Sequence, residues 1–117
     1  ELTKLGRAPV VVVVAAIRRD SAKVPFDEQF AAAAAAAQNA LLAATALGYG
    51  SMWRTGDVAY DPTVKAALGL APDDAIVGFV YLGSPHEGSR QHEARVADLD
   101  DFVEYWEPST GLRDQRS

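Results

Sequence analysis

The 117-residue chain contains no cysteine. It therefore can form no disulfide, offers no thiolate nucleophile and builds no cysteine-ligated metal site. Positive charge is also scarce, because 16 acidic residues outnumber 11 basic ones and give a net charge of −5. Such a balance provides no basic face for nucleic acid or anionic lipid. We expect no nucleic acid, no membrane and no metal among the partners of this protein.

Targeting and membrane-spanning segments are missing as well. The hydrophobic run that follows Pro9 is short and has no small-residue cleavage pattern. The Ala-rich stretch is interrupted by Gln38 and Asn39 and is too short for a comfortable membrane span. Hydrophobic residues still make up 49% of the chain, which excludes a disordered protein. We expect a soluble, cytoplasmic protein of one domain.

Two β-rich runs are present. Residues 10–17 form an uninterrupted apolar series rich in valine, which predicts a central strand covered on both faces. Residues 75–82 predict a second strand, which Gly83, Ser84 and Pro85 close.

A long helix is predicted between these strands, over residues 27–47. Seven consecutive alanines, residues 31–37, leave little side chain on any face. Neighbouring backbones can therefore approach closely, and we expect a central, buried helix. Asp27 is the candidate N-cap of this helix, and Gly48 is placed to end it.

A second, shorter helix is predicted after Asp61. Pro62 suits its first position, and Gly69 should end it after Leu68. Farther along, residues 86–98 are polar and lack periodicity, so we expect an extended connection.

The most informative stretch is residues 48–56, which we interpret as a ligand loop. Its three glycines allow a planar ligand to approach main-chain N–H groups. Trp53 and Arg54 place an aromatic ring beside a fixed positive charge, as a conjugated, phosphate-bearing cofactor requires. Alternatives remain for each residue. Trp53 could be a packing aromatic, Arg54 could pair with Asp57 or cap helix carbonyls, and Thr55 could serve as a local start signal.

The order of these motifs resembles the FMN-dependent nitroreductase family, and most closely its small single-domain NAD(P)H nitroreductases. The resemblance covers nearly the whole chain, and its most specific part is the Trp-Arg-Thr-Gly sequence. The matching segments are Arg7-Ala8-Pro9-Val10, Asp27 to Leu47, Gly48 to Gly56, Asp61-Pro62-Thr63-Val64-Lys65, Leu68-Gly69-Leu70 and Ile76 to Pro85.

The resemblance implies an α+β nitroreductase-like fold, with a central mixed or antiparallel sheet flanked by helices and a long Ala-rich core helix. The family's N-terminal Arg-Arg-Ser motif for the flavin phosphate does not occur here, and the chain opens at Glu1. We therefore expect residues 1–117 to be the C-terminal portion of a single nitroreductase-like domain, with the N-terminal part of the fold absent. Residues 86–117 would form the polar connection and a C-terminal extension.

By the same resemblance, FMN is the cofactor, NAD(P)H the co-substrate and a homodimer the assembly. The activity implied is hydride transfer from NAD(P)H through FMN to nitro compounds or quinones, and no catalytic side chain is required. The implied FMN contacts are Trp53, Arg54, Thr55, Gly50 and Ser51. The segment where nicotinamide contacts are placed in this family corresponds to Ala43, Ala44, Thr45, Ala46, Leu47 and Gly48.

Three further readings remain open. The apolar residues Phe102, Val103, Tyr105 and Trp106 need a surface to cover them, either on a partner subunit or on the chain's own core. His86 and His92 flank acidic residues, but without helical register they do not favour a metal site. A catalytically incomplete flavin-binding or dimerisation module is the alternative function.

Overall fold

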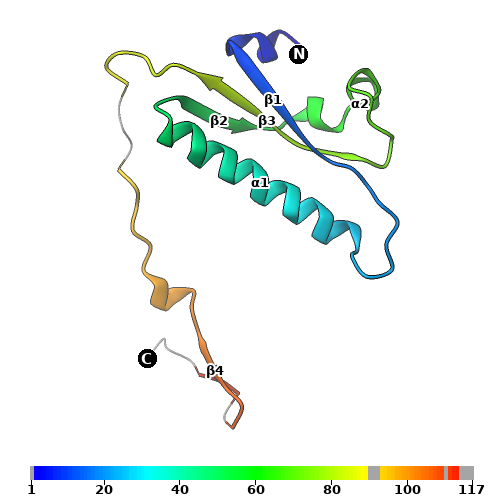
Figure 1. Ribbon diagram of the computed structural model, residues 1–117. Helices are drawn as coiled ribbons and strands as arrows, with labels where there is room; N and C mark the ends of the chain where they lie inside the picture. The colour runs from blue at the N-terminus through cyan, green and yellow to red at the C-terminus, as the bar shows by residue number, and fades with distance from the viewer. Residues whose placement is uncertain (1, 90–92, 110, 114–117) are drawn as a thin grey trace. The chain divides into compact units, whose positions relative to one another are not determined.

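The computed structural model describes residues 2–89, 93–109 and 111–113 (Figure 1). The chain divides into two compact units, Glu1–Glu87 and Gly88–Ser117. The elements of the first unit are the 3-10 helix η1 (Leu2–Arg7), strand β1 (Val10–Ala16), helix α1 (Phe26–Ala46), strand β2 (Gly50–Arg54), the 3-10 helix η2 (Asp57–Tyr60), helix α2 (Pro62–Ala67) and strand β3 (Ala75–Gly83).

The three strands form one antiparallel sheet in the order β1-β3-β2. The central strand is therefore β3, whose residues 76–80 are all buried. The prediction that residues 10–17 form a central strand is wrong, since β1 lies at an edge of this sheet and Val10 remains 53% exposed. An apolar run indicates hydrophobic surroundings but not the order of the strands, which depends here on pairing with residues 59 to 72 positions away.

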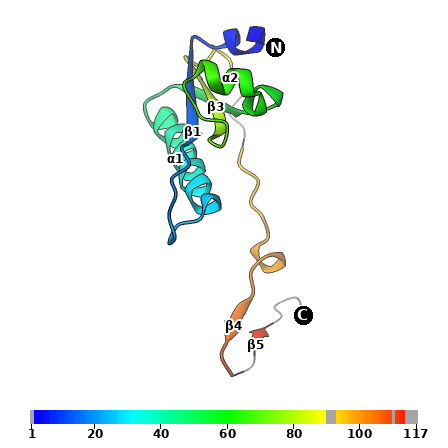
Figure 2. The same ribbon diagram turned by 90° about the vertical axis from the view of Figure 1, so that its right-hand side faces the viewer.

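Helix α1 covers one face of the sheet, and η1, η2 and α2 lie on the other (Figure 2). On the second face a small core forms around Ala59, Ile76 and Phe79. The partly buried hydrophobic residues packed against it are Leu5, Val11, Val13, Val58, Val64, Leu70 and Tyr81. Both faces of β3 are thus covered, which explains its continuous burial.

Helix α1 contacts the sheet along a narrow stripe. Its buried residues are Ala37 and Ala44, seven positions apart and hence on one face of the helix. The expectation of a buried helix is wrong for this structure, because most of its other residues are exposed to solvent. The small side chains of α1 would permit another element to approach any face of the helix. Among the described residues, only the sheet packs against it, on one face.

The ends of α1 confirm one prediction and overturn another. Gly48 adopts φ +85°, and the Tyr49 N–H donates to the Ala44 carbonyl at 2.9 Å, so the helix ends as predicted. Asp27 does not cap the other end. Pro25 occupies the N-cap position without a side-chain hydrogen bond, and Asp27 lies in the first turn, where its charge favours the helix dipole.

The start of α2 agrees with the prediction. The Asp61 carboxylate accepts a hydrogen bond from the Thr63 N–H at 2.8 Å, and Pro62 follows at the first helical position. Leu68 is the C-cap, and Gly69 adopts φ +74° beyond it. The predicted strand over residues 75–82 is also confirmed as β3.

The second unit contains a short 3-10 helix η3 (Leu99–Asp101) and a hairpin of β4 (Tyr105–Glu107) and β5 (Gly111–Arg113). The four apolar residues of the extension are exposed, with Phe102 at 79% and Trp106 at 62%. The described part of the predicted connection, residues 86–89 and 93–98, contains no helix or strand, whereas His92 lies outside the described residues. Within the described residues, no helix combines the length and apolar character needed to span a membrane.

Candidate functional site

The stretch interpreted as a ligand loop contains a strand. Residues 50–54 form β2, which pairs with β3 so that Arg54 lies opposite Phe79, Trp53 opposite Val80 and Met52 opposite Tyr81. Because side chains alternate along a strand, Arg54 and Trp53 project to opposite faces of the sheet. The structure therefore separates two residues that the sequence places side by side.

An open hollow of about 460 Å³ lies on the Arg54 side of the sheet. We call it the arginine hollow. Its lining comes from the end of η1, the two residues between η1 and β1, strand β2, the end of β3 and the residue after it. The lining residues are Arg7, Ala8, Pro9, Gly50, Ser51, Met52, Arg54, Tyr81, Leu82, Gly83 and Ser84. Three of the five residues predicted to contact FMN, Gly50, Ser51 and Arg54, meet in this hollow.

The charge of this hollow is positive, since among the described residues its charged lining side chains are those of Arg7 and Arg54. Within the described part of the chain, Arg54 makes no ion pair with Asp57, and its guanidinium Nη1 instead lies 3.6 Å from the Met52 sulfur. A thioether is a weak, neutral acceptor and leaves the cation uncompensated. A protein of net charge −5 thus presents a local site suited to an anion.

Thr55 lines a smaller neighbouring hollow of about 230 Å³, together with Arg54, Asp57 and Tyr81. Arg54 and Tyr81 border both hollows, so the two lie next to each other on the same face. The second hollow includes a carboxylate, which makes it less favourable to an anion than the first.

Trp53 packs on the α1 side of the sheet. Its indole N–H donates to the Val77 carbonyl at 3.2 Å, and its ring lies over Gly78. These contacts give Trp53 the packing role that the sequence left open as an alternative. Its contact with FMN stays a prediction.

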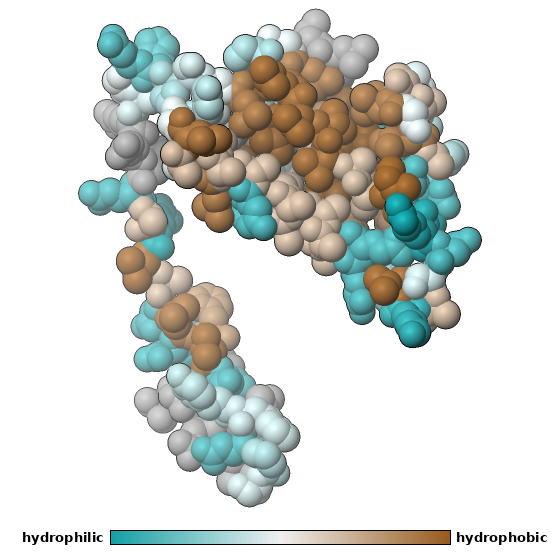
Figure 3. All heavy atoms as spheres, viewed as in Figure 1, coloured by the Kyte–Doolittle hydropathy of each residue, from teal (hydrophilic) through white to brown (hydrophobic). Residues whose placement is uncertain are grey.

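The segment proposed for nicotinamide borders an apolar groove of about 540 Å³ between α1 and the sheet. Ala43, Ala44 and Leu47 line it from the helix, opposite Val10 and Val80. Hydrophobic atoms also gather over β1, above the paler alanine surface of α1 (Figure 3). The Thr45 hydroxyl instead donates to the Leu41 carbonyl within the helix, and neither Ala46 nor Gly48 lines the groove. The described residues that line this groove include no charged group that would recognise a dinucleotide.

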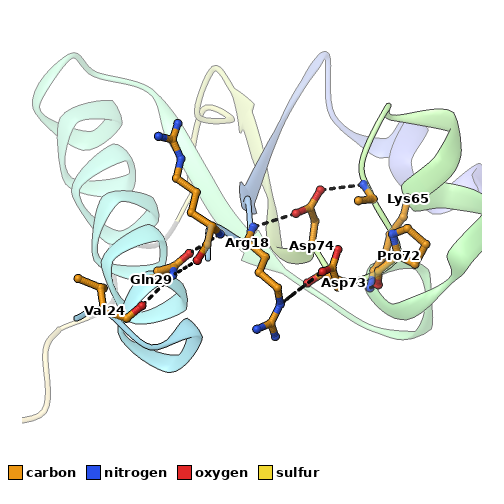
Figure 4. A network of polar contacts seen from close by, with 9 residues as sticks. Arg18, Val24, Gln29, Lys65, Pro72, Asp73 and Asp74 are labelled. Atoms are coloured by element: carbon orange, nitrogen blue, oxygen red, sulfur yellow. Dashed lines mark hydrogen bonds and ion pairs between the residues drawn. The ribbon is translucent and has the colours of Figure 1, made fainter. Parts of the chain in front are cut away.

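A network of polar contacts lies at the other end of β3 (Figure 4). The buried Asp74 carboxylate accepts hydrogen bonds from the Ala71 N–H at 2.7 Å and the Arg18 N–H at 2.8 Å. These two backbone hydrogen bonds lower the pKa of Asp74 below its ordinary value, and the one from Ala71 has the larger effect. Gln29 binds the loop between β1 and α1 through the backbone of Arg19 and Val24. These contacts fix the scaffold.

Sequence reasoning missed eight of the eleven lining residues, and three of those eight carry a charged or hydroxyl side chain: Arg7, Tyr81 and Ser84. All three lie in recognised motifs but were not assigned to the site. In the sheet, Tyr81 pairs with Met52, which lines the same hollow. Strand alternation from Arg54 would have placed Tyr81 on the same face once the register was known. Within the described residues, no group of three or more metal-ligating side chains is present.

Comparisons with known proteins identify the family of this chain. The model of the nitroreductase family matches residues 1–84. The chain is 38% identical over 100 residues to "Putative NAD(P)H nitroreductase YdjA" of Escherichia coli (strain K12), a match that covers 86% of this chain and 54% of that protein. It is 32% identical over 100 residues to "Putative NAD(P)H nitroreductase YfhC" of Bacillus subtilis, covering 86% of this chain and 50% of that protein.

Among solved structures, a nitroreductase-like family protein from Bacillus cereus superposes with a TM-score of 0.67 at 28% sequence identity. The match covers 83% of this chain and 50% of that one. The chain therefore spans about half the length of the curated relatives and the solved structure that it matches.

Proposed function

Because this chain belongs to the nitroreductase family, we propose that it forms the C-terminal portion of a single nitroreductase-like domain that acts as an FMN-dependent NAD(P)H nitroreductase. The α+β fold agrees with this assignment, as does the solved nitroreductase-like structure at a TM-score of 0.67. The observation that carries the cofactor proposal is the arginine hollow.

The residues of this hollow fit one part of an FMN molecule. FMN combines a planar conjugated ring with a phosphate, so it needs both cations and close access to the backbone. Arg7 and Arg54 supply cations, Ser51 offers a hydroxyl, and Gly50 presents its backbone without a side chain. We propose Gly50, Ser51, Arg54 and the adjacent Thr55 as FMN contacts, with Trp53 supporting β2 from the opposite face.

FMN, when bound, would supply the redox chemistry that transfers a hydride from NAD(P)H to a nitro compound or quinone. The chain's own residues would bind the cofactor and orient the substrates toward it. A guanidinium at Arg54 favours negative charge on the group beside it. The apolar groove next to Ala43, Ala44 and Leu47 would exclude water and receive an uncharged ring.

We further propose that the protein works as a cytoplasmic homodimer on small electrophiles. The exposed apolar side chains of the first unit support an assembly, because Leu42 on α1 and Leu47 at its C-cap are 59% and 74% exposed. In this proposal the C-terminal extension contributes Phe102 and Trp106 to further contacts.

A catalytically incomplete flavin-binding or dimerisation module is the second candidate. It is favoured by one observation, namely that the chain spans about half the length of the relatives it matches. Under this alternative the arginine hollow retains affinity for a flavin, but turnover requires residues from elsewhere.

The test is a steady-state assay of the purified protein with FMN, NADH or NADPH, and a quinone or nitroaromatic acceptor. The nitroreductase proposal predicts nucleotide oxidation that depends on both FMN and the acceptor. Flavin binding without turnover would support the module instead. Absence of both would refute the proposed function.

A further inference from the structure

We propose that Arg7 is a second ligand-binding residue of the arginine hollow and that it holds a phosphate group of the bound ligand. This inference rests on the proposed function and extends it to a residue outside the Trp-Arg-Thr-Gly motif. It identifies the ligand of the hollow as a phosphate-bearing molecule rather than a neutral ring alone.

The first argument is position. Arg7 is the last residue of η1, and three residues later the chain enters the sheet at Val10, which pairs with Leu82. A side chain added to Gly83 would lie 3.3 Å from the Pro9 ring, so the backbone just after Arg7 is packed tightly against the end of β3. The junction of η1 and β1 is therefore held at the rim of the hollow.

The second argument is charge. Arg7 arrives from the β1 side of β3 and Arg54 from the β2 side, so two cations from distant parts of the sequence line one hollow. Among the described residues that line it, none carries a carboxylate. An anion bound in this hollow is attracted by both guanidiniums, so the pair favours a negatively charged ligand.

The third argument is chemistry. A guanidinium presents a rigid fork of N–H donors that matches the oxygens of a phosphate. The Ser84 hydroxyl, which lines the same hollow, can donate a further hydrogen bond to such a group. Two ligands of the proposed reaction carry phosphate, namely FMN and the pyridine nucleotide, and the test must separate them.

The experiment uses the protein in its natural length and compares Arg7→Gln with the unchanged protein. Fluorescence titrations measure the dissociation constants of FMN and of riboflavin, which lacks the phosphate, and a third titration uses NADH. The matched control is Arg19→Gln, because Arg19 lies in the loop between β1 and α1 and lines none of the hollows near the site. A further variant, Arg7→Lys, keeps the positive charge but lacks the planar set of N–H donors of a guanidinium.

We expect Arg7→Gln to weaken binding of one phosphate-bearing ligand about tenfold. The affinity of Arg7→Gln for riboflavin should stay within about twofold of that of the unchanged protein. The affinity of Arg7→Lys for the phosphate-bearing ligand should lie between those of the unchanged protein and Arg7→Gln. The difference in affinity between Arg7→Gln and the unchanged protein should shrink as the salt concentration is raised. A loss for FMN assigns the phosphate to the flavin, and a loss for NADH assigns it to the nucleotide. Both results support the proposal.

The inference is overturned if Arg7→Gln matches Arg19→Gln for FMN and for NADH. It is also overturned if riboflavin and FMN weaken equally without any effect on NADH, because Arg7 would then act on the ring. The proposed function fails by a different result, since it requires the unchanged protein to take up FMN at all.

Discussion

The indole ring of Trp53 occupies the space that a side chain on Gly78 would fill. A β-carbon at Gly78 would clash with the indole nitrogen and would lie 3.1 Å from the Arg54 carbonyl oxygen. The indole N–H also bonds to the neighbouring Val77 carbonyl. This contact fixes β2 against β3 on the α1 side and so directs Arg54 to the opposite face, into the arginine hollow.

Gly78→Ala should therefore destabilise the protein by about 1–3 kcal/mol, because the new methyl group must displace a ring held by a hydrogen bond. Chemical denaturation measures this change in the free energy of unfolding. Gly6→Ala is the matched control, since a β-carbon there has no neighbour within 4 Å, and it should change stability by less than about 0.5 kcal/mol. Equal effects of the two substitutions would contradict the packing described here.

Trp53→Phe separates the packing role of the indole from cofactor binding. It keeps an aromatic ring but removes the N–H that satisfies the Val77 carbonyl, so stability should fall by about 1–2 kcal/mol. FMN affinity of the folded variant should change by less than about threefold, whereas Arg54→Gln should weaken it about tenfold. Flavin fluorescence titration compares the two. The opposite ranking would place the indole in the cofactor site.

Asp74 should make stability depend on pH. The Ala71 and Arg18 N–H groups lower the pKa of Asp74 below its ordinary value of 3.8, and they do so by stabilising the charged form in the folded state. The resulting stabilisation is complete above pH values near the ordinary pKa and is lost as pH falls through the lowered pKa. Asp74→Asn should therefore destabilise the protein at pH 7, and the difference from the unchanged protein should narrow below about pH 4.

Asp73→Asn is the control for this series. The Asp73 carboxylate is 65% exposed and lies 3.7 Å from the Arg18 side chain, an arrangement that contributes little to stability. Denaturation curves at pH 7 and pH 3 measure both variants. A difference for Asp74→Asn that grows on acidification would contradict the assigned direction of the pKa shift.

The local signals in the sequence predicted much of the fold. Asp61 and Pro62 marked the start of α2, Gly48 marked the end of α1, and the apolar run after Asp74 became β3. Each of these features is decided by residues close in the chain, through capping, a left-handed glycine or β-branched side chains. The motif around Trp53 likewise identified the nitroreductase family, which the family model confirms over residues 1–84.

Features that depend on distant residues could not be predicted. The position of β1 at an edge of the sheet depends on which strands pair with it. The exposure of α1 depends on which elements pack against it. The separation of Trp53 from Arg54 follows from the pairing of β2 with β3, a register between residues about 25 positions or more apart. Glycines favoured a loop there, yet the pairing with β3 determined a strand. Arg7 and Tyr81 joined the site through the same long-range contacts.

The measurement that tests the central claim most directly is the visible absorbance of the purified protein as FMN is added, for the unchanged chain and for Arg54→Gln. If the arginine hollow binds the cofactor, the unchanged protein should bind FMN saturably with a perturbed flavin spectrum. Arg54→Gln should need about ten times more FMN for the same occupancy. An unchanged protein that leaves the FMN spectrum unaltered, or an Arg54→Gln variant that binds FMN equally well, would contradict the account.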